Sequence, residues 1–308
     1  MPLRVRFRGV EHREALLFEG PNGWAEWSPF LEYPAAEAAV WLAGALDFAY
    51  GSVPELRTDA VNVNATLPAV APEQVRAVLE PFGQFEVVKI KVAEAGQSHN
   101  DDLARIRAVR DQYPDARIRL DANGGFDLKA AERMAIAMMQ FGVPLEYFEQ
   151  PVSSVAELAE LRSRVAGYGV KVAADESIRK NTDPLEVARL QAADIVVVKA
   201  QPLGGVGRAL ELVKQAGLPA VVSSALETSV GLAMGVQLAA ALGSPYAAGL
   251  GTATLLAEDV TDDPLLPVAG KLPVRRVAPS EERLQRLAAS PERRQWWLQR
   301  LAEAHALL

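Results

Sequence analysis

The sequence predicts an α/β protein: a TIM-type (β/α)8 barrel, or a modified form of one, with a small α+β capping domain. Two observations predict the barrel. From about residue 60, short apolar runs typical of buried parallel strands alternate with segments whose apolar residues have helical spacing. Many of these runs end in a charged residue, and five such ends, from Lys91 to Lys199, follow one another at intervals of 24 to 30 residues. That interval is the length of one strand–loop–helix unit, so the charges should gather at one end of the barrel.

The first 59 residues have a different pattern and predict the capping domain. Residues 3–9 and 14–20 are typical of antiparallel strands in a small sheet, whereas residues 20–30 are rich in Gly and Pro and predict a loop. Residues 35–51 have helical spacing. The charged, helical segment 275–308 should pack on this domain through its two tryptophans, Trp296 and Trp297, without contacting substrate.

Residues 60–274 should form the barrel. We expect eight strands, at residues 61–67, 87–92, 117–124, 147–151, 171–177, 194–200, 219–226 and 246–251. We expect the helices between them at residues 72–82, 101–113, 128–142, 155–165, 184–193, 205–217 and 230–242.

A doubly wound open sheet is the alternative architecture. No GxGxxG in a strand–helix context and no GxxxxGK[ST] is present, which disfavours nucleotide-binding versions of that fold. Gly204 and Gly205 follow a strand and precede a helix. They are compatible with a phosphate cradle, but a tight turn is the favoured interpretation.

The composition narrows the function classes. The chain has 308 residues, half of them hydrophobic, and a net charge of −7 without a basic patch, so a nucleic-acid partner is not expected. It has no cysteine, which fits a reducing cytoplasm and excludes disulfide and thiolate chemistry. The first 18 residues carry charges throughout and predict no signal peptide, and no apolar stretch is long enough to predict a membrane-spanning helix.

Three carboxylates end successive predicted strands: Asp121, Glu149 and Asp175. Buried charges are costly unless they serve one another or a metal ion. Hard oxygen ligands suit Mg²⁺, which keeps positions for water or substrate. We therefore expect a divalent metal site here rather than surface charges or structural ion pairs.

Three lysines accompany the carboxylates. Lys89 and Lys91 are two residues apart on one strand and share a face, whereas Lys199 ends a strand well around the barrel. The flanking Val and Ile residues argue against an exposed edge strand. A partly desolvated lysine among other cations has a lowered pKa and can act as a base near neutrality.

These motifs together resemble the enolase superfamily, specifically its muconate-cycloisomerase-like subgroup. They are KIK at 89–91, LDANGG at 120–125, FEQP at 148–151, ADES at 174–177 and VVVKAQPLGG at 196–205. The resemblance implies a lysine base and Mg²⁺ stabilising an ene-diolate formed next to a substrate carboxylate.

The resemblance also implies individual roles. Asp121, Glu149 and Asp175 resemble the Mg²⁺ ligands, and Lys91 resembles the acid/base. Lys89 would lower the pKa of Lys91 and bind the carboxylate, and Lys199 would act from the opposite side. Asn123 shares the inward face with Asp121 and would hydrogen-bond substrate or a ligand, and Glu176 would point away and pair with a lysine. Gln150 and Pro151 would shape the turn, and Ser177 has either a structural or a polar-network role.

Several activities share this kind of site. The three histidines end no predicted strand, which disfavours subgroups with a histidine base. The eighth strand lacks the acid pair of dipeptide epimerases. SSALETSVG at 223–231 resembles the o-succinylbenzoate synthases, which implies dehydration of 2-succinyl-6-hydroxy-2,4-cyclohexadiene-1-carboxylate in menaquinone biosynthesis. N-succinylamino acid racemase is the alternative enzyme, and a catalytically dead barrel serving as a binding scaffold is the non-enzyme alternative.

The expected partner is thus a small carboxylate substrate. Ser223, Ser224 and Thr228 would bind its succinyl carboxylate, with a barrel-filling layer of small residues as the alternative for the two serines. Gly249 and Gly251 would let substrate approach the backbone. The loop with Trp24, Trp27 and Phe30 would cover the barrel mouth or, alternatively, make a hydrophobic contact within the capping domain.

Overall fold

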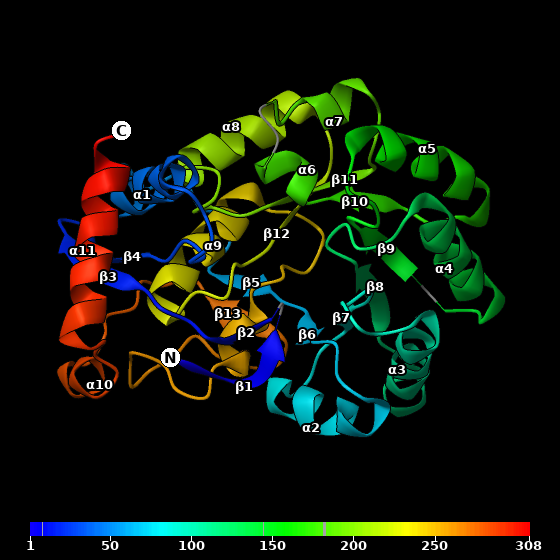
Figure 1. Ribbon diagram of the computed structural model, residues 1–308, viewed down its shortest axis with the longest axis horizontal. Coiled ribbons are helices and arrows are strands. Elements are labelled where there is room, and N and C mark those ends of the chain that lie inside the picture. Colours follow the sequence, from blue (N-terminus) through cyan, green and yellow to red (C-terminus); the bar gives the residue numbers. More distant parts are fainter. Residues whose placement is uncertain (8, 144, 181–182) are drawn as a thin grey trace.

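The computed structural model describes residues 1–7, 9–143, 145–180 and 183–308. Its centre is one sheet of seven parallel strands in the order β12-β11-β10-β9-β8-β7-β6 (Figure 1). The strands are β6 (Ala65–Leu67), β7 (Val87–Lys91), β8 (Arg117–Asp121), β9 (Leu145–Glu149), β10 (Val172–Ala174), β11 (Ile195–Val198) and β12 (Ala220–Val222). Helices cover the outside of the sheet, which confirms the predicted α/β barrel class.

The eighth predicted strand, 246–251, closes the barrel without forming a regular strand. Ala248 bridges to Val63 and Gly249 bridges to Ser223, both in parallel orientation. The chain then enters the 3-10 helix η4 (Gly251–Leu255), so the segment makes only one bridge on each side. The expectation of a regular eighth strand is therefore wrong, although this segment does lie between the first and the seventh barrel strands and closes the barrel.

The helices follow the predicted alternation. They are η1 (Pro72–Gln74), α2 (Val75–Leu79), η2 (Glu80–Phe82), α3 (His99–Gln112), α4 (Leu128–Gln140), α5 (Val155–Val165), η3 (Ala166–Tyr168), α6 (Glu176–Arg179), α7 (Glu186–Arg189), α8 (Val206–Ala216) and α9 (Ser229–Leu242). The predicted helix 184–193 shrinks to α7, because the chain adopts positive φ at Gln191 and turns toward β11. The unpredicted α6 begins directly after Asp175.

Two short strands extend the barrel. β5 (Ala60–Asn62) pairs antiparallel with β13 (Lys271–Pro273), so the predicted strand 61–67 divides into β5 and β6. Val63 and Asn64 separate them, and the side-chain amide of Asn64 bonds the backbone carbonyl of Ala65 at 2.8 Å. The first barrel strand is accordingly shorter than the apolar pattern predicts.

Within its described residues, the capping domain contains two hairpins and one helix. The hairpins pair β1 (Pro2–Phe7) with β2 (Val10–His12) and β3 (Leu16–Gly20) with β4 (Gly23–Trp27), and the helix is α1 (Ala35–Tyr50). The prediction of a loop over residues 20–30 is wrong for β4, because Gly20 pairs with Gly23 and confines the turn to two residues. Residues 3–7 and 16–20 belong to separate hairpins.

The C-terminal helices α10 (Glu281–Arg286) and α11 (Pro291–His305) lie beside this domain (Figure 1). The ring of Trp297 meets that of Trp27 edge-on at 5.4 Å, and its indole N–H donates to Glu14 at 2.7 Å. Trp296 stays 37% exposed. The last helix thus shares one hydrophobic cluster with the capping domain.

The two glycines before α8 have a packing role. Gly205 has a φ of 117°, and a Cβ built there would lie 2.5 Å from Oδ2 of Asp47 on α1. A Cβ on Gly44 of α1 would lie 2.9 Å from the backbone nitrogen of Gly205. The glycine pair therefore allows α1 to contact the barrel, which favours the tight-turn interpretation over a phosphate cradle.

Candidate active site

The structure gathers the six charged strand-end residues at one mouth of the barrel. Lys91, Asp121 and Glu149 stand side by side because the register aligns β7, β8 and β9 at these positions. Asp175 and Lys199 follow the ends of β10 and β11. All six residues are at most 6% exposed. Parallel strands in a barrel end at the same face, so the regular spacing of these charged residues in the sequence places them in one buried cluster.

Each carboxylate is paired with a lysine. Nζ of Lys91 lies 2.5 Å from Oδ2 of Asp121, and Nζ of Lys199 lies 2.6 Å from Oδ2 of Asp175. Nζ of Lys89 lies 3.0 Å from Oε1 of Glu149 and 3.2 Å from Oδ2 of Asp121. The buried charges therefore compensate one another, as burial requires.

The pairs shift the pKa values in opposite directions. Burial raises the pKa of Glu149 to about 7, and the like charge of Asp121 contributes to this rise. Burial also acts to raise the pKa of Asp121, but Lys91 and Lys89 outweigh it and hold that pKa well below its usual range. Lys199 does the same for the pKa of Asp175. Burial acts to lower the pKa of Lys89, yet Glu149 and Asp121 raise it above its usual value.

The donor set fits a divalent cation in its chemistry. In the described part of the chain no three carboxylate or imidazole side chains already converge as metal ligands, and each of these carboxylates has a lysine ammonium as its partner. The site nevertheless contains three buried carboxylates of the hard-oxygen type. Burial is the main cause of the raised pKa of Glu149, and the nearby charge of Asp121 adds to it; a bound cation would offset that second contribution.

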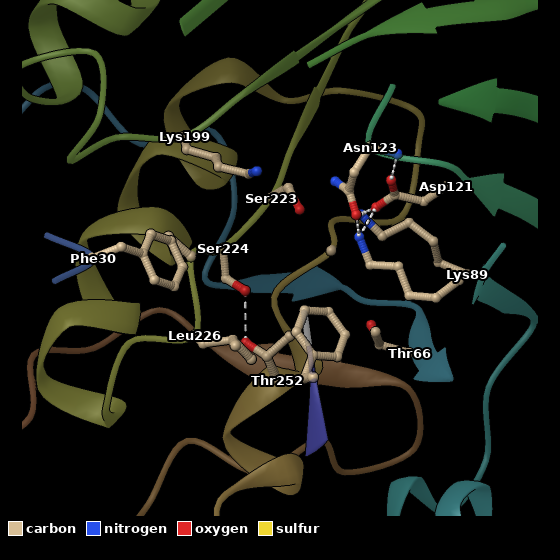
Figure 2. A pocket seen from close by; sticks show the side chains of 14 residues that line it. Phe30, Thr66, Lys89, Asp121, Asn123, Lys199, Ser223, Ser224, Leu226 and Thr252 are labelled. Carbon is tan, nitrogen blue, oxygen red and sulfur yellow. Dashed lines mark hydrogen bonds and ion pairs between the residues drawn. The ribbon is translucent and has the colours of Figure 1, made fainter. Parts of the chain in front are cut away.

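A small cavity opens above this cluster. Figure 2 shows Lys199 across the cavity from Lys89 and Asp121. The side chains around it come from both domains: Phe7, Phe30, Thr66, Lys89, Lys91, Asp121, Asn123, Lys199, Ser223, Ser224, Ala225, Leu226, Gly249 and Thr252. Glu149 and Asp175 are absent from this lining and lie beneath it. A substrate in the cavity would therefore meet lysines on two sides.

Asn123 holds the proposed acid/base lysine. Its φ of 46° turns the chain after β8, and its Oδ1 accepts from Nζ of Lys91 at 2.5 Å. Its Nδ2 donates to Oε1 of Glu176 at 3.2 Å. Glu176 also accepts from Arg179, a cationic partner that the sequence did not predict. Asn123 thus orients Lys91 within reach of the cavity.

The hydroxyls near β12 divide into two sets. Ser223 and Ser224 face the cavity (Figure 2), and Oγ of Ser224 lies 2.7 Å from Oγ1 of Thr252. Thr228 does not face the cavity, because it caps α9 and its hydroxyl donates to Glu26. The expectation that Thr228 binds the substrate is therefore wrong, whereas the two serines keep a possible contact.

The predicted close-approach glycines serve the protein's own packing. A Cβ on Gly249 would lie 2.7 Å from Oγ of Ser223, and one on Gly251 would lie 2.9 Å from the carbonyl oxygen of Asn64. Both glycines therefore admit neighbouring chain segments. Gly249 also borders the cavity, so the expectation that substrate approaches the backbone there stays a prediction, whereas Gly251 is not part of the cavity lining.

Of the three aromatic residues expected to cover the mouth of the barrel, one lines the cavity. Phe30 lines the cavity, whereas Trp27 is fully buried inside the capping domain and Trp24 lies on β4. We call residues 28–34 the lid loop. Phe7 of β1 is a second capping-domain contributor, which the sequence did not single out; its ring centroid lies 5.1 Å from Nζ of Lys91.

Gln150 builds the turn after β9. Its Oε1 accepts from the backbone nitrogens of Asp175 and Ser177 at 3.0 and 3.1 Å, and its Nε2 donates to the Ser177 hydroxyl at 2.7 Å. Ser177 therefore belongs to a polar network. Arg179 and Tyr33 also reach this site, and their contact with each other carries no sequence signal because they lie far apart in the chain.

Two family models match the chain. The enolase C-terminal domain-like model matches residues 71–279, and the enolase N-terminal domain-like model matches residues 1–49. This chain belongs to the enolase superfamily. The superfamily match covers the barrel that carries the lysines and carboxylates, so the resemblance expected from the motifs is confirmed.

Relatives and solved structures of the superfamily agree with this assignment. The o-succinylbenzoate synthase of Mycobacterium tuberculosis is 51% identical over the whole chain and 93% of its own length. That of Mycobacterium ulcerans is 49% identical over the whole chain and 92% of its own length. The muconate lactonizing enzyme of Pseudomonas fluorescens has the same fold, with a TM-score of 0.76 at 18% identity over 92% of this chain and 94% of that enzyme.

Proposed function

We propose that this protein is an o-succinylbenzoate synthase, a hydro-lyase that converts 2-succinyl-6-hydroxy-2,4-cyclohexadiene-1-carboxylate into 2-succinylbenzoate and water in menaquinone biosynthesis. The observation that carries the proposal is the full-length identity of about one half to o-succinylbenzoate synthases. The cavity between Lys91 and Lys199 supports it, because a ring lying there would meet one lysine on each side.

Lys91 is the proposed acid/base. As the neutral amine it would remove the ring proton next to the substrate carboxylate, and as the ammonium it would return that proton to the departing hydroxide. The ring becomes aromatic and water leaves, so atoms and charge balance. Asn123 and Asp121 orient the Lys91 amine by hydrogen bonds of 2.5 Å.

Proton removal next to a carboxylate creates a dianion, which needs positive charge nearby. Lys199 would supply a cation over the opposite ring face, and Lys89 would support the carboxylate side. Asp121, Glu149 and Asp175 would hold a Mg²⁺ ion, which when bound supplies divalent charge to the substrate carboxylate. Ser223 and Ser224 would hydrogen-bond the succinyl carboxylate, since their hydroxyls are donors of small volume at the cavity wall.

The direct test is dehydration of the cyclohexadiene substrate by the purified protein with Mg²⁺, followed by ultraviolet detection of 2-succinylbenzoate. We expect turnover by the natural chain and a loss of at least about 10³-fold in kcat for Lys91→Ala. Lys171→Ala is the matched control, because Lys171 is an exposed lysine one residue before β10. Full activity of Lys91→Ala, or no product from the natural chain, would overturn the proposal.

N-succinylamino acid racemase is the second candidate, because two lysines on opposite sides of a cavity are also what a two-base racemase requires. Incubation with N-succinyl amino acids in D₂O separates the two. Exchange of the alpha proton with racemisation that is faster than dehydration of the cyclohexadiene would favour the racemase. A scaffold without activity would give neither reaction.

A further inference from the structure

Arg179 lies at a junction behind the active site. It ends the short helix α6, and its side chain is only 3% exposed. The guanidinium donates from Nε to Oδ1 of Asp175 at 3.1 Å and from Nη2 to Oε1 of Glu176 at 2.6 Å. From Nη1 it donates to the hydroxyl of Tyr33 at 3.1 Å. Three different nitrogens thus serve three acceptors on two domains.

Two of these bonds lead to the two proposed catalytic lysines. The other oxygen of Asp175 accepts from Lys199 at 2.6 Å. Along the second path, Glu176 accepts from Asn123 at 3.2 Å, and Asn123 in turn accepts from Lys91 at 2.5 Å. Lys199 and Lys91, on opposite sides of the cavity, are therefore both connected to the one guanidinium.

The third bond leads to the lid loop. The ring of Tyr33 meets that of Phe30 edge-on at 5.4 Å, and Phe30 lines the cavity (Figure 2). The backbone of this loop is held from the other side by Arg300 of α11, which donates to the carbonyls of Phe30 at 2.7 Å and Tyr33 at 3.0 Å. The position of the Tyr33 hydroxyl is thus tied to the position of the cavity cover.

We propose that Arg179 is a positioning residue. It fixes the side chains of Lys91, Lys199 and the proposed metal ligand Asp175 in position relative to the lid loop. The bond from Nε fixes one oxygen of Asp175 and leaves the other directed at Lys199. The bond to Tyr33 makes this arrangement depend on the loop being in place over the cavity. The inference rests on the proposed function only for the roles of the lysines and the metal.

The chemistry of the guanidinium explains why an arginine stands here. Its planar fork presents five N–H donors in fixed directions, whereas a lysine ammonium is a point charge at the end of a flexible stem. A lysine at this position would keep the charge opposite Asp175 and Glu176, but its single ammonium could not serve both carboxylates and the Tyr33 hydroxyl in three fixed directions. Arg179→Lys therefore separates positioning from simple charge compensation.

The experiment compares Arg179→Lys, Tyr33→Phe and the double variant by Mg²⁺ calorimetry, by kcat and by thermal unfolding. We expect Arg179→Lys to weaken Mg²⁺ binding and to lower kcat, each by about 10- to 100-fold, as is usual when the partner of a metal ligand is altered. Tyr33→Phe should lower kcat by roughly 3- to 10-fold with little change in melting temperature, as for loss of one hydrogen bond. The double variant should match Arg179→Lys, because Tyr33 acts through Arg179.

Arg162→Lys is the matched control. Arg162 also donates from Nε to a carboxylate, that of Asp194, at 2.7 Å, and from Nη1 to a carbonyl, that of Gln191, at 3.0 Å, but it lies outside the site. We expect natural Mg²⁺ affinity and kcat for it. Unchanged Mg²⁺ affinity in a folded Arg179→Lys variant would overturn the proposal. So would a double variant whose loss of kcat equals the product of the losses in Arg179→Lys and Tyr33→Phe. If Arg179→Lys does not fold, an unchanged kcat in Tyr33→Phe overturns it.

The Mg²⁺ measurement separates this inference from the proposed function. A natural chain that forms no 2-succinylbenzoate, together with Mg²⁺ binding that weakens in Arg179→Lys, would refute the assigned reaction and support the positioning role. An active natural chain whose Arg179→Lys variant binds Mg²⁺ normally would support the reaction and refute the positioning role.

Discussion

Lys199 has a different task from Lys91 in a dehydration, and its side chain can be exchanged to show this. A cation over the ring needs only charge, so Lys199→Arg should keep dehydration within about tenfold, whereas Lys199→Met should lose roughly 10²-fold or more in kcat. Arginine does not exchange protons near neutrality. Any alpha-proton exchange at the Lys199 face, followed by NMR in D₂O, should therefore vanish in both variants. Equal loss of dehydration in Lys199→Arg and Lys199→Met would instead show that Lys199 transfers a proton.

Individual residues also show which parts of the site can be predicted from the sequence and which cannot. The lysines and carboxylates could be predicted because each ends an apolar run, and the barrel places all such ends at one face. Thr228 was assigned to the substrate because it lies near two serines in the chain, but its partner is Glu26, more than 200 residues away. The bond between Arg179 and Tyr33 is unpredictable for the same reason, since the two residues are far apart in sequence. Partners that distant have no local pattern.

At the scale of elements, the strand β4 caps a barrel helix. Glu26 of β4 accepts from the backbone nitrogens of Thr228 and Gly231 at 3.1 Å each, at the start of α9. A Cβ on Gly231 would lie 2.7 Å from the carboxyl carbon of Glu26, so only glycine admits this contact. An acceptor from the capping domain therefore satisfies donors that a helix leaves unpaired at its N-terminus.

This cap gives the protein a pH dependence. Burial raises the pKa of Glu26 to about 7, and Glu227 adds to the rise, while hydrogen bonds from Ser28 and Thr228 oppose it. A raised pKa means that the fold favours the neutral carboxyl. This contribution to the free energy of unfolding is complete below about pH 4.5 and is lost as the pH rises through 7. The loss should amount to about 3 kcal/mol above pH 8, from the cost of one pKa unit.

Glu26→Gln removes that titration. We expect the free energy of unfolding of Glu26→Gln, relative to the natural chain, to rise between pH 5 and pH 8.5 in urea titrations. Glu19→Gln is the matched control, since Glu19 is an exposed residue on the partner strand β3. A difference between Glu26→Gln and the natural chain that stays constant over this pH range would contradict the assigned protonation.

The elements that the sequence misjudged share a physical cause. The apolar run of 246–251 predicts a strand, yet the chain must turn into η4 at Gly251 to pack beneath the capping domain. The Gly and Pro content of residues 20–30 predicts a loop, yet cross-strand pairing confines the turn to two residues and extends β4. In both places tertiary contacts override local propensity.

At the scale of the whole molecule, the buried charge cluster should link metal binding to stability. A ligand that binds only the folded state stabilises it by about 2.7 kcal/mol at 100 times its Kd. For a chain of this length we expect a rise in melting temperature of roughly 5 °C on adding Mg²⁺, and its reversal by a chelator together with loss of activity. The rise requires three carboxylates contributed by different strands, so only the assembled barrel can produce it.

Two glutamates of β9 provide the variant pair for this prediction. Glu149 belongs to the charge cluster, whereas Glu146 pairs with Arg119 at 2.5 Å near the other end of the strand. We expect Glu149→Gln to abolish the Mg²⁺-dependent rise, because it removes an anionic ligand from the site. Glu146→Gln should lower the melting temperature, since it leaves the buried Arg119 guanidinium short of a partner, and should keep the rise intact. A full rise in Glu149→Gln, measured by scanning calorimetry with and without Mg²⁺, would place the metal elsewhere than at these strand ends.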